Sequence, residues 1–576
     1  MTPRRHFLRA LCIGFAALAS WHHRFLLDPD GICYVDIAKF YLRGDWHSAL
    51  NSYWSPLFSW LIAAAFGVFE PSMYYEIPLV HAVILLAFVA GVVAWEWLIR
   101  EWERWQGPPA HPALIEAAGY ATLFWAGKHL QTLVLTTPDV LLIPIFLAAT
   151  AILVRVRSGT GRTRDAVLLG LLLGSGFLAK AAFLPAIPLF LLGLAACAGT
   201  WRDRRIAATA ATASILLLPF VAAVSIERGR LVLSDAGRLN YSWVVDGYSV
   251  TGYKEGVKPQ PAGAAHPARV AFVEPLLLSY DQRPVGTIPA HFDPSWWSEG
   301  YPVEFEVERQ WLAVQSGVAT ALEILAGSPA LILLVLVIFV GSGRGLGSIA
   351  RATWLNWWLW APACAVLSAL SLVYVQERYL AGAATVLAFS LIASIWHHSL
   401  GPWRTRLTFI LLIATVSIVM VRDARTLVGG LRELAGRADN ENAFMPALAQ
   451  RLCREGMSRG DKVAIIGDPL AVPWLALAEG QVIATVPASI RHDEGQLERP
   501  LVLGLERPTA FWRADPVTRN SVLETAAALG ATFTIARQVP DWADMTGWVL
   551  VSPTDALRVR GFRPGVYLKK LVGPGR

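Results

Sequence analysis

The chain has 576 residues, of which 55% are hydrophobic and 16% are charged. Average globular domains carry about 25% charged residues, so the composition excludes an ordinary soluble domain and indicates a membrane protein. The formal net charge of +7 does not indicate nucleic-acid binding, because the arginines gather in short segments between apolar runs and therefore report membrane topology. The five cysteines form no CxxC pair, which argues against a zinc or thioredoxin-like motif; we expect five free thiols.

Eleven apolar runs predict a mainly α, polytopic protein with about eleven transmembrane helices. The first, 7–27, follows a basic start and could instead be a signal peptide, but either interpretation places the next segment outside. The other runs are 75–99, 113–128, 138–155, 166–181, 183–200, 206–226, 324–342, 353–373, 379–396 and 407–421. Arginines fill alternate loops, and the positive-inside rule makes those loops cytoplasmic.

The remaining segments are then extracytoplasmic: 28–74, 128–137, 227–318, 374–378 and everything after about 422. Within the first of them, 55–69 is apolar but shorter than a comfortable span, and Pro56 suits a first helical turn. We interpret it as an interfacial or re-entrant helix. Counting it as a span would place the arginine loops outside.

The C-terminal part changes in composition, and we expect two domains, a transmembrane domain at 1–421 and a soluble α/β domain at 422–576. An amphipathic stretch at 443–457 leads to a buried strand in KVAIIGDP, 462–469. Strand-like and helix-like pieces then alternate to residue 571, which is typical of a small α/β domain. No GxGxxG follows the strand, so we assign it no nucleotide site.

The polar, aromatic segment 28–69 follows the first helix. Asp28 and Asp30 begin it, and Tyr34 stands four residues after the second acid. Carboxylates near a membrane interface are costly unless they are solvated, paired or functional. From position alone, a solvated helix end explains these two acids equally well.

The pattern that follows Asp30 resembles the first outer loop of GT-C glycosyltransferases, above all lipid A aminoarabinose transferases and protein O-mannosyltransferases. Its motifs are Ile37-Ala38, Gly44-Asp45-Trp46, Trp54-Ser55-Pro56-Leu57 and Trp60. The resemblance implies that Asp30 is, or positions, the catalytic base and that the donor is a polyprenyl-phosphate sugar. Gly31 stands where the family has Glu, and Ser55-Pro56 replaces its Pro-Pro.

Three later stretches fit the same resemblance, which covers about residues 1–200 and 370–395. Thr136-Thr137-Pro138-Asp139 resembles the second acidic motif, and GSGFLAK at 174–180 resembles a short outer turn that ends in a basic residue, here Lys180. Glu377-Arg378-Tyr379-Leu380 resembles the motif whose arginine holds the lipid phosphate.

The chemistry of transfer needs a carboxylate that takes the acceptor proton and a cation that steadies the leaving phosphate. We expect Asp30 to be the base, Asp139 to orient it or a divalent cation, and Arg378 and Lys180 to bind the phosphate. Asp139 could instead cap a helix, Arg378 could be an interfacial anchor, and Lys180 could snorkel to the headgroups.

Further substrate-binding candidates are Asp28, Tyr34, Glu377, Tyr379, His129, Trp296 and Trp297. His129 is more often a surface histidine than a catalyst. Trp296 and Trp297 could stack on a sugar or cover a lipid entrance, and a membrane-facing aromatic belt explains them equally well.

These observations predict an inverting glycosyltransferase of the inner membrane that works on its outer face. Its partners would be a polyprenyl-phosphate-sugar donor, a lipid, glycan or protein acceptor, and membrane lipids, with no nucleic acid. One alternative is a transporter or flippase of lipid-linked saccharides, although such proteins often show repeated halves that are not evident here. The other is a non-catalytic envelope assembly protein of the same fold.

Overall fold

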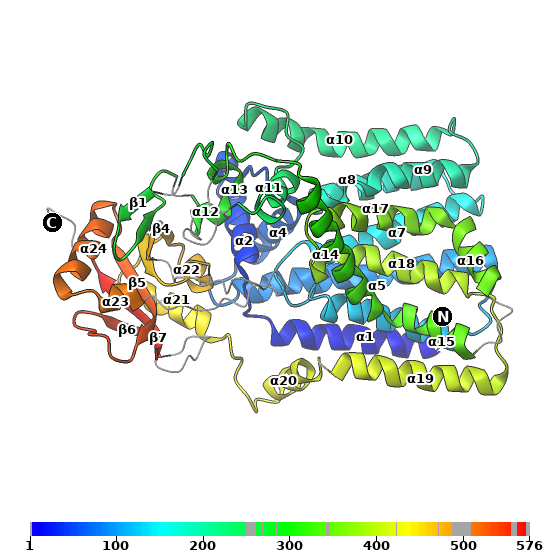
Figure 1. Ribbon diagram of the computed structural model, residues 1–576. Helices are drawn as coiled ribbons and strands as arrows, with labels where there is room; N and C mark the ends of the chain where they lie inside the picture. The colour runs from blue at the N-terminus through cyan, green and yellow to red at the C-terminus, as the bar shows by residue number, and fades with distance from the viewer. Residues whose placement is uncertain are drawn as a thin grey trace.

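The protein is a mainly α, polytopic membrane protein with a sheet-containing part beyond one end of its helix bundle (Figure 1). The computed structural model describes residues 3–248, 261–267, 269–283, 285–340, 346–421, 423–470, 472–486, 509–553 and 562–571. Parts of the predicted loop 227–318 and of the predicted domain 422–576 lie outside these residues. All five cysteines are free, as expected.

Each of the eleven predicted spans falls on a helix of the bundle. These helices are α1 (Pro3–His22), α5 (Glu76–Gln106), α6 (Pro112–Phe124), α7 (Asp139–Arg157), α8 (Thr163–Ala179), α9 (Ala186–Ala198), α10 (Arg204–Glu227), α15 (Pro329–Val340), α17 (Trp357–Ser371), α18 (Ala381–Ser394) and α19 (Pro402–Val421). Within the described residues, five are long and apolar enough to cross a membrane alone: α5, α7, α9 with the turn before it, α10 and α19. The others are shorter or more polar.

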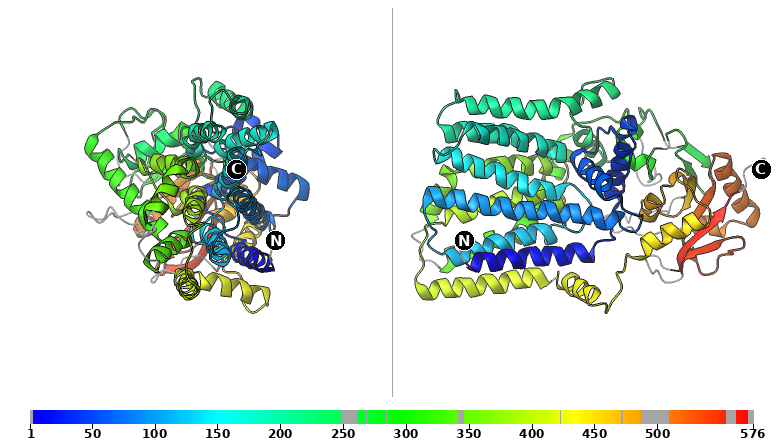
Figure 2. Two further views of the ribbon diagram at one scale, coloured as in Figure 1. Left: turned by 90° about the vertical axis from the view of Figure 1, so that its right-hand side faces the viewer. Right: turned by 180° about the vertical axis from the view of Figure 1, so that it is seen from behind.

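The arginine-rich helix ends lie together at the end of the bundle away from the sheet, where the N-terminus also lies (Figures 1 and 2). Arg5 at the start of α1 pairs with Glu116 at 2.7 Å and also with Glu103 near the end of α5. Arg155 near the end of α7 lies 3.1 Å from Glu101 on α5. The predicted arginine-rich loops therefore lie at one end of the bundle, and the side of the membrane that each end faces stays a prediction.

Short elements cover the opposite end of the bundle. They are α2 (Pro29–Leu42), α3 (Trp46–Ala49), α4 (Leu57–Phe69), α11 (Ala236–Val244), α12 (Pro289–Phe292), α13 (Pro294–Trp297) and the 3-10 turn η3 (Glu377–Leu380). Helix α2 starts with Pro29 at its first position, which suits a fixed φ, and carries Asp30 in its first turn, where the helix dipole favours an acid. Helix α4 starts directly after Pro56, and its 13 residues are too few for an ordinary span.

The loop predicted at 227–318 ends earlier than expected, because helix α14 (Val307–Ala326) begins inside it. Helices α14 and α15 are bent by 72° at the break between them and make a sixth candidate span if they are counted as one. Pro329 opens α15 directly after the Gly327-Ser328 break. Proline lacks the backbone N–H that a continuous helix would need there, so the chain turns instead.

The sheet has seven strands in the order β1-β2-β4-β3-β5-β7-β6. The strands are β1 (Arg269–Phe272), β2 (Leu277–Ser279), β3 (Lys462–Ile466), β4 (Gln481–Val486), β5 (Phe533–Pro540), β6 (Val549–Ser552) and β7 (Phe562–Lys570). The helices around it are α21 (Phe444–Arg454), α22 (Pro473–Leu477), α23 (Thr509–Arg513) and α24 (Pro516–Ala528). The predicted alternation of strands and helices is confirmed. Strands β1 and β2 come from the long loop, so that loop and the C-terminal part share one sheet, and a domain boundary at 421 stays a prediction.

Helix α2 is held from two sides. Lys39 donates a hydrogen bond to the backbone oxygen of Ala476 in α22 at 3.3 Å and lies 3.7 Å from Glu479. Asp36 accepts hydrogen bonds from the backbone N–H of Thr287 at 2.7 Å and from its hydroxyl at 3.1 Å. Burial raises the pKa of Asp36 to about 6, although these two bonds oppose the rise. The C-terminal part and the long loop together fix the helix that carries Asp30.

Candidate active site

Arg378 in η3 is buried and faces three carboxylates. Its Nη2 lies 2.5 Å from Asp30 Oδ2, its Nη1 3.9 Å from Asp28 Oδ2, and its Nε 3.8 Å from Asp139 Oδ2. Residues from three distant stretches therefore meet around one guanidinium, at the end of the bundle nearer the sheet. A cation shared by several acids is expected where buried charges must be paired.

Lys180 extends the cluster from the end of α8. Its ammonium pairs with Asp139 and lies 3.5 Å from the centre of the Tyr379 ring. Asp139 opens α7, but its carboxylate also accepts a hydrogen bond from the Thr137 hydroxyl at 2.9 Å. Because the side chain of Asp139 is 1% exposed and bonds to these side chains, it belongs to the cluster and does not cap the helix.

Asp28 is held by the second acidic motif. The backbone N–H of Thr136 donates to Asp28 Oδ1 at 2.7 Å, and the Thr136 hydroxyl donates to the same oxygen. Burial and the charge of Asp30 raise the pKa of Asp28. A Cβ atom on residue 31 would lie 2.7 Å from Thr136 Cβ. Gly31, which departs from the resembled family, therefore leaves the space through which Thr136 reaches Asp28.

Asp30 has a second partner that the sequence did not single out. His291 Nε2 lies 3.2 Å from Asp30 Oδ1, while Asp30 Oδ2 contacts Arg378. Burial alone would raise the pKa of Asp30, but Arg378 and His291 outweigh burial and hold it below its ordinary value. The Trp54 ring lies 5.3 Å from the His291 ring, and its N–H donates to the His291 backbone oxygen at 3.1 Å. His291 belongs to the long loop, and no motif or residue spacing in the sequence indicated a role for it.

Three other predicted residues lie beside the cluster. Tyr34 is buried in α2, and its ring packs edge-on against Trp54 at 5.3 Å. Tyr379 places its ring beneath the Lys180 ammonium. Glu377 accepts a hydrogen bond from Gln131 at 2.7 Å. Glu377 thus braces the neighbouring loop and is not the ion-pair partner of the adjacent arginine.

The remaining predicted residues lie elsewhere, and no contact within the described ranges joins them to Arg378. The ring of His129 stacks with Trp125 at 6.4 Å. Trp297 is 2% exposed, so its ring is not free to stack on a sugar or to face lipid. Trp296 is partly buried, and its ring stacks with His266 at 3.7 Å.

No set of three or more His, Cys, Asp or Glu side chains in the described part of the chain is arranged to hold a metal ion. The three carboxylates of the cluster bond to arginine, lysine and histidine instead. A divalent cation stays a prediction. Chemically, the cluster offers a guanidinium and an amine that can bind a phosphate, and a carboxylate–histidine pair that can hold a proton.

Comparison with known proteins gives neighbours in structure alone. No protein-family model matches the chain, and no curated protein matches its sequence. The crystal structure of ArnT from Cupriavidus metallidurans in the apo state is similar, with 13% identity over 98% of this chain and 99% of that chain and a TM-score of 0.38. ArnT bound to undecaprenyl phosphate has 14% identity, the same coverage and a TM-score of 0.40. Similarity this low says nothing about individual residues, whose roles follow from the contacts above.

Proposed function

We propose that this protein is an integral membrane glycosyltransferase that moves a sugar from a polyprenyl-phosphate donor to an acceptor at the extracytoplasmic face. The observation that carries the proposal is the buried Arg378, shared by Asp28, Asp30 and Asp139, with Lys180 beside it. A donor phosphate is an oxyanion at the membrane boundary, and guanidinium and ammonium groups are the side chains that bind one.

The transfer is a single displacement. The acceptor oxygen attacks the anomeric carbon, the bond from that carbon to the phosphate oxygen breaks, and polyprenyl phosphate leaves with the electron pair. Arg378 and Lys180 stabilise the charge that develops on the phosphate. The acceptor proton passes to the pair formed by Asp30 and His291. Attack opposite the leaving group inverts the configuration of the sugar.

Arg378 has a second consequence for Asp30. Without a donor it keeps the Asp30 carboxylate charged and hydrogen-bonded, which makes the carboxylate a weak base. A donor phosphate competes for the same guanidinium. When the phosphate takes over part of its hydrogen bonds, the proton affinity of Asp30 rises, so the base is strengthened once the donor is in place.

The site argues against both rivals. Transporters usually place their binding groups near the membrane midplane, on broken helices, whereas these charges gather at one end of the bundle. A scaffold without activity would have no need for three carboxylates around a buried arginine, since buried charges add little to stability. The positive-inside rule, applied to the arginine-rich opposite end, supports an inner-membrane protein whose sheet-containing part is extracytoplasmic.

Two variants test the proposal. Asp30→Asn should express, fold and bind undecaprenyl phosphate, but should no longer release labelled sugar from the polyprenyl-phosphate donor in membranes. Arg378→Gln should lose undecaprenyl phosphate binding, measured on purified protein in detergent, while the exposed Arg451→Gln on α21 should bind as the unmodified protein does. Unchanged sugar release by Asp30→Asn, or unchanged lipid binding by Arg378→Gln, would refute the assignment.

A further inference from the structure

Helix α12 (Pro289–Phe292), which carries His291, is a single turn that depends on support from other parts of the chain. A helix this short is not stable by itself in water, and the carbonyl groups at the end of a helix have no partners within it. The start of the segment is held by α2, because Asp36 accepts two hydrogen bonds from Thr287. The contacts at its other end therefore decide where the His291 ring lies.

Side chains of the α3–α4 connection, residues 50–56, bind the two carbonyl groups at the end of α12. The Trp54 indole N–H donates to the backbone oxygen of His291 at 3.1 Å. The Asn51 amide donates to the backbone oxygen of Phe292 at 2.7 Å. Two successive peptide groups are thus capped by a distant part of the chain, directly at the candidate catalytic histidine.

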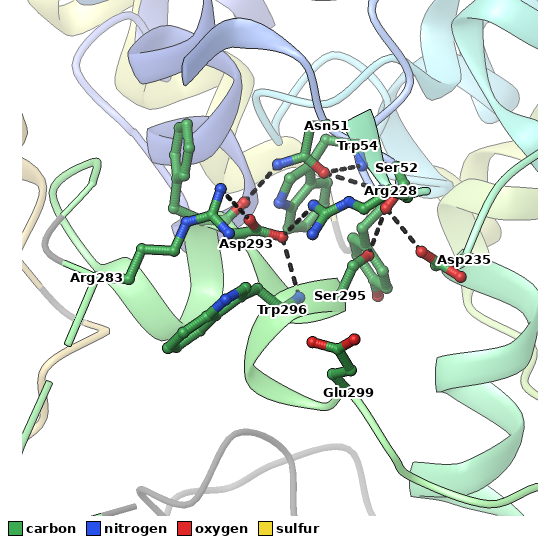
Figure 3. A network of polar contacts seen from close by, with 12 residues as sticks. Asn51, Ser52, Trp54, Arg228, Asp235, Arg283, Asp293, Ser295, Trp296 and Glu299 are labelled. Atoms are coloured by element: carbon green, nitrogen blue, oxygen red, sulfur yellow. Dashed lines mark hydrogen bonds and ion pairs between the residues drawn. The ribbon is translucent and has the colours of Figure 1, made fainter. Parts of the chain in front are cut away.

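Asn51 joins the two sides of this contact (Figure 3). Its amide oxygen accepts from the backbone N–H groups of Tyr53 at 2.9 Å and Trp54 at 3.0 Å, while its amide nitrogen donates to Phe292. The oxygen faces two donors and the nitrogen faces an acceptor, which fixes the orientation of the amide. Because Asn51 is 3% exposed, solvent does not readily replace these partners.

A local turn explains only some of these bonds. An asparagine oxygen that accepts from N–H groups two and three residues further on makes a common turn, and an aspartate would serve that turn equally well. The bond to Phe292 needs a donor, and it joins residues that are 241 positions apart in the sequence. The contact with the long loop, and not the turn, therefore requires the amide.

Asn51 also supports the second contact with His291. It holds the backbone of Trp54, whose ring packs edge-on against the imidazole with the ring centres 5.3 Å apart. The histidine is thus held at its backbone and at its ring by groups that Asn51 fixes. In this position its Nε2 lies 3.2 Å from Asp30 Oδ1.

The next part of the α12–α13 segment is anchored independently of Asn51. Asp293 pairs with Arg228 at 2.7 Å and with Arg283 at 3.2 Å (Figure 3). Loss of the bond from Asn51 should therefore displace the end of α12 without releasing the whole segment. The position of His291 can then be changed in a protein that still folds.

We propose that Asn51 is a positioning residue for the transfer reaction, which holds the His291 imidazole against Asp30 through Trp54 and the end of α12. The inference rests on the proposed transferase function, in which the pair formed by Asp30 and His291 takes the acceptor proton. Asn51 itself contacts neither the donor nor the reacting atoms, so its loss should reduce turnover and leave donor binding intact.

The main test is Asn51→Asp in the full-length protein. The new carboxylate keeps the acceptors that the turn needs, but it has no donor for Phe292, whose carbonyl oxygen it repels. The kcat for sugar transfer should fall about 10- to 100-fold, since a displacement near 1 Å can cost a factor of about 100. The KM for the polyprenyl-phosphate donor and the binding of undecaprenyl phosphate should stay within about twofold.

The matched control is Asn356→Asp at the start of α17. The Asn356 amide also donates to a backbone oxygen, that of Ala352 at 2.9 Å, but at the opposite end of the bundle (Figure 1). This variant should transfer sugar as the unmodified protein does.

A pH series separates positioning from general damage. Burial and the Phe292 oxygen disfavour the charged form of the introduced carboxyl group, so its pKa is raised, and the protonated form regains an O–H donor. The kcat of Asn51→Asp relative to the unmodified protein should therefore rise as the pH falls from about 7.5 to about 5.5. Asn51→Ala cannot titrate and should show no recovery. Asp30, His291 and Asp293 are common to all three proteins, so their own titration cancels in the ratio.

Two further measurements test whether Asn51 acts through His291. Asn51→Asp should cause no additional loss of kcat in a protein that already carries His291→Gln, because both changes then remove the same contribution. Hydrogen exchange should become faster in residues 289–297 and stay unchanged in the sheet. This second measurement does not depend on the reaction.

The proposal is overturned by a normal kcat in Asn51→Asp, by an equal loss of undecaprenyl phosphate binding, by the same recovery in Asn51→Ala, or by a full additional loss beside His291→Gln. If the unmodified protein transfers no sugar, the proposed function fails separately, and hydrogen exchange alone decides. Faster exchange confined to 289–297 then supports the positioning of His291 by Asn51, and unchanged exchange there refutes it.

Discussion

Replacing Arg378 with glutamine is the most direct test of the buried cluster. The change removes the cation that lies within 4 Å of Asp28, Asp30 and Asp139. Lys180, which pairs with Asp139, is then the one lysine or arginine left among the cluster residues described. Breaking a buried ion pair by removing one partner costs about 3–5 kcal/mol, because the other charge stays buried without compensation. We expect a loss of that size in the free energy of unfolding near pH 7.

The pH dependence of this loss has a definite sign. In the unmodified protein the pKa of Asp30 is held below its ordinary value, so its stabilising contribution is present above about pH 4 and is lost below it. Without the guanidinium, the pKa values of Asp28 and Asp30 both rise. Protonation of these carboxylates then relieves the repulsion between them. The variant therefore gains stability relative to the unmodified protein as the pH falls from about 7 to about 5.

Thermal unfolding in detergent, followed at several pH values for both proteins, measures the difference. Arg378→Lys is a useful companion, because an ammonium keeps the charge but cannot reach three carboxylates as the guanidinium fork does. We expect it to recover part of the stability. A glutamine variant as stable as the unmodified protein at neutral pH, or a stability gap that widens as the pH falls, would show that Arg378 is not the shared partner of these acids.

Three further changes have defined outcomes. Gly31→Ala should destabilise the protein by about 1–3 kcal/mol in thermal unfolding, because the new methyl group meets Thr136; an unchanged melting temperature contradicts the crowding. His291→Gln should keep undecaprenyl phosphate binding while sugar transfer falls about 100-fold, whereas equal loss of both would indicate a structural role. Burial raises the pKa of Asp36 to about 6, so its contribution to stability should fall as the pH rises from about 4 to about 6. Asp36→Asn should remove that dependence from the melting curves. If the melting temperature of the variant still changes with pH as that of the unmodified protein does, other groups cause the dependence.

The cluster of charges around Arg378 was largely predictable from the sequence, for a physical reason. Asp30, Asp139 and Arg378 each stand at the edge of an apolar run, where a charge is costly and therefore conspicuous. Their order along the chain resembled one superfamily, which suggested that they meet. One partner that fixes their geometry, His291 beside Asp30, depends on the packing of α2 against the long loop and had no local signal.

The parts that the sequence did not reveal share a cause, which is long-range pairing. Strands β1 and β2 are short, and β2 becomes a strand because Leu278 and Ser279 pair with Thr485 and Ala484 on β4, about two hundred residues away. The same long loop brings His291 to Asp30. Hydrophobic periodicity and secondary-structure propensity report only the local conformational preference of a segment. They cannot show that a loop segment joins a distant sheet or brings a histidine to an acid.

Four arginines of the long loop illustrate how one signal can hide another. Positive charge in short loops reports topology, and long loops are largely exempt from that bias. Arg228, Arg230, Arg238 and Arg283 all belong to the long loop on the end opposite the arginine-rich one, so topology does not account for them. A cation without a topological reason needs a local one, and here the buried Asp235 and Asp293 supply it, because between them they pair with all four guanidinium groups.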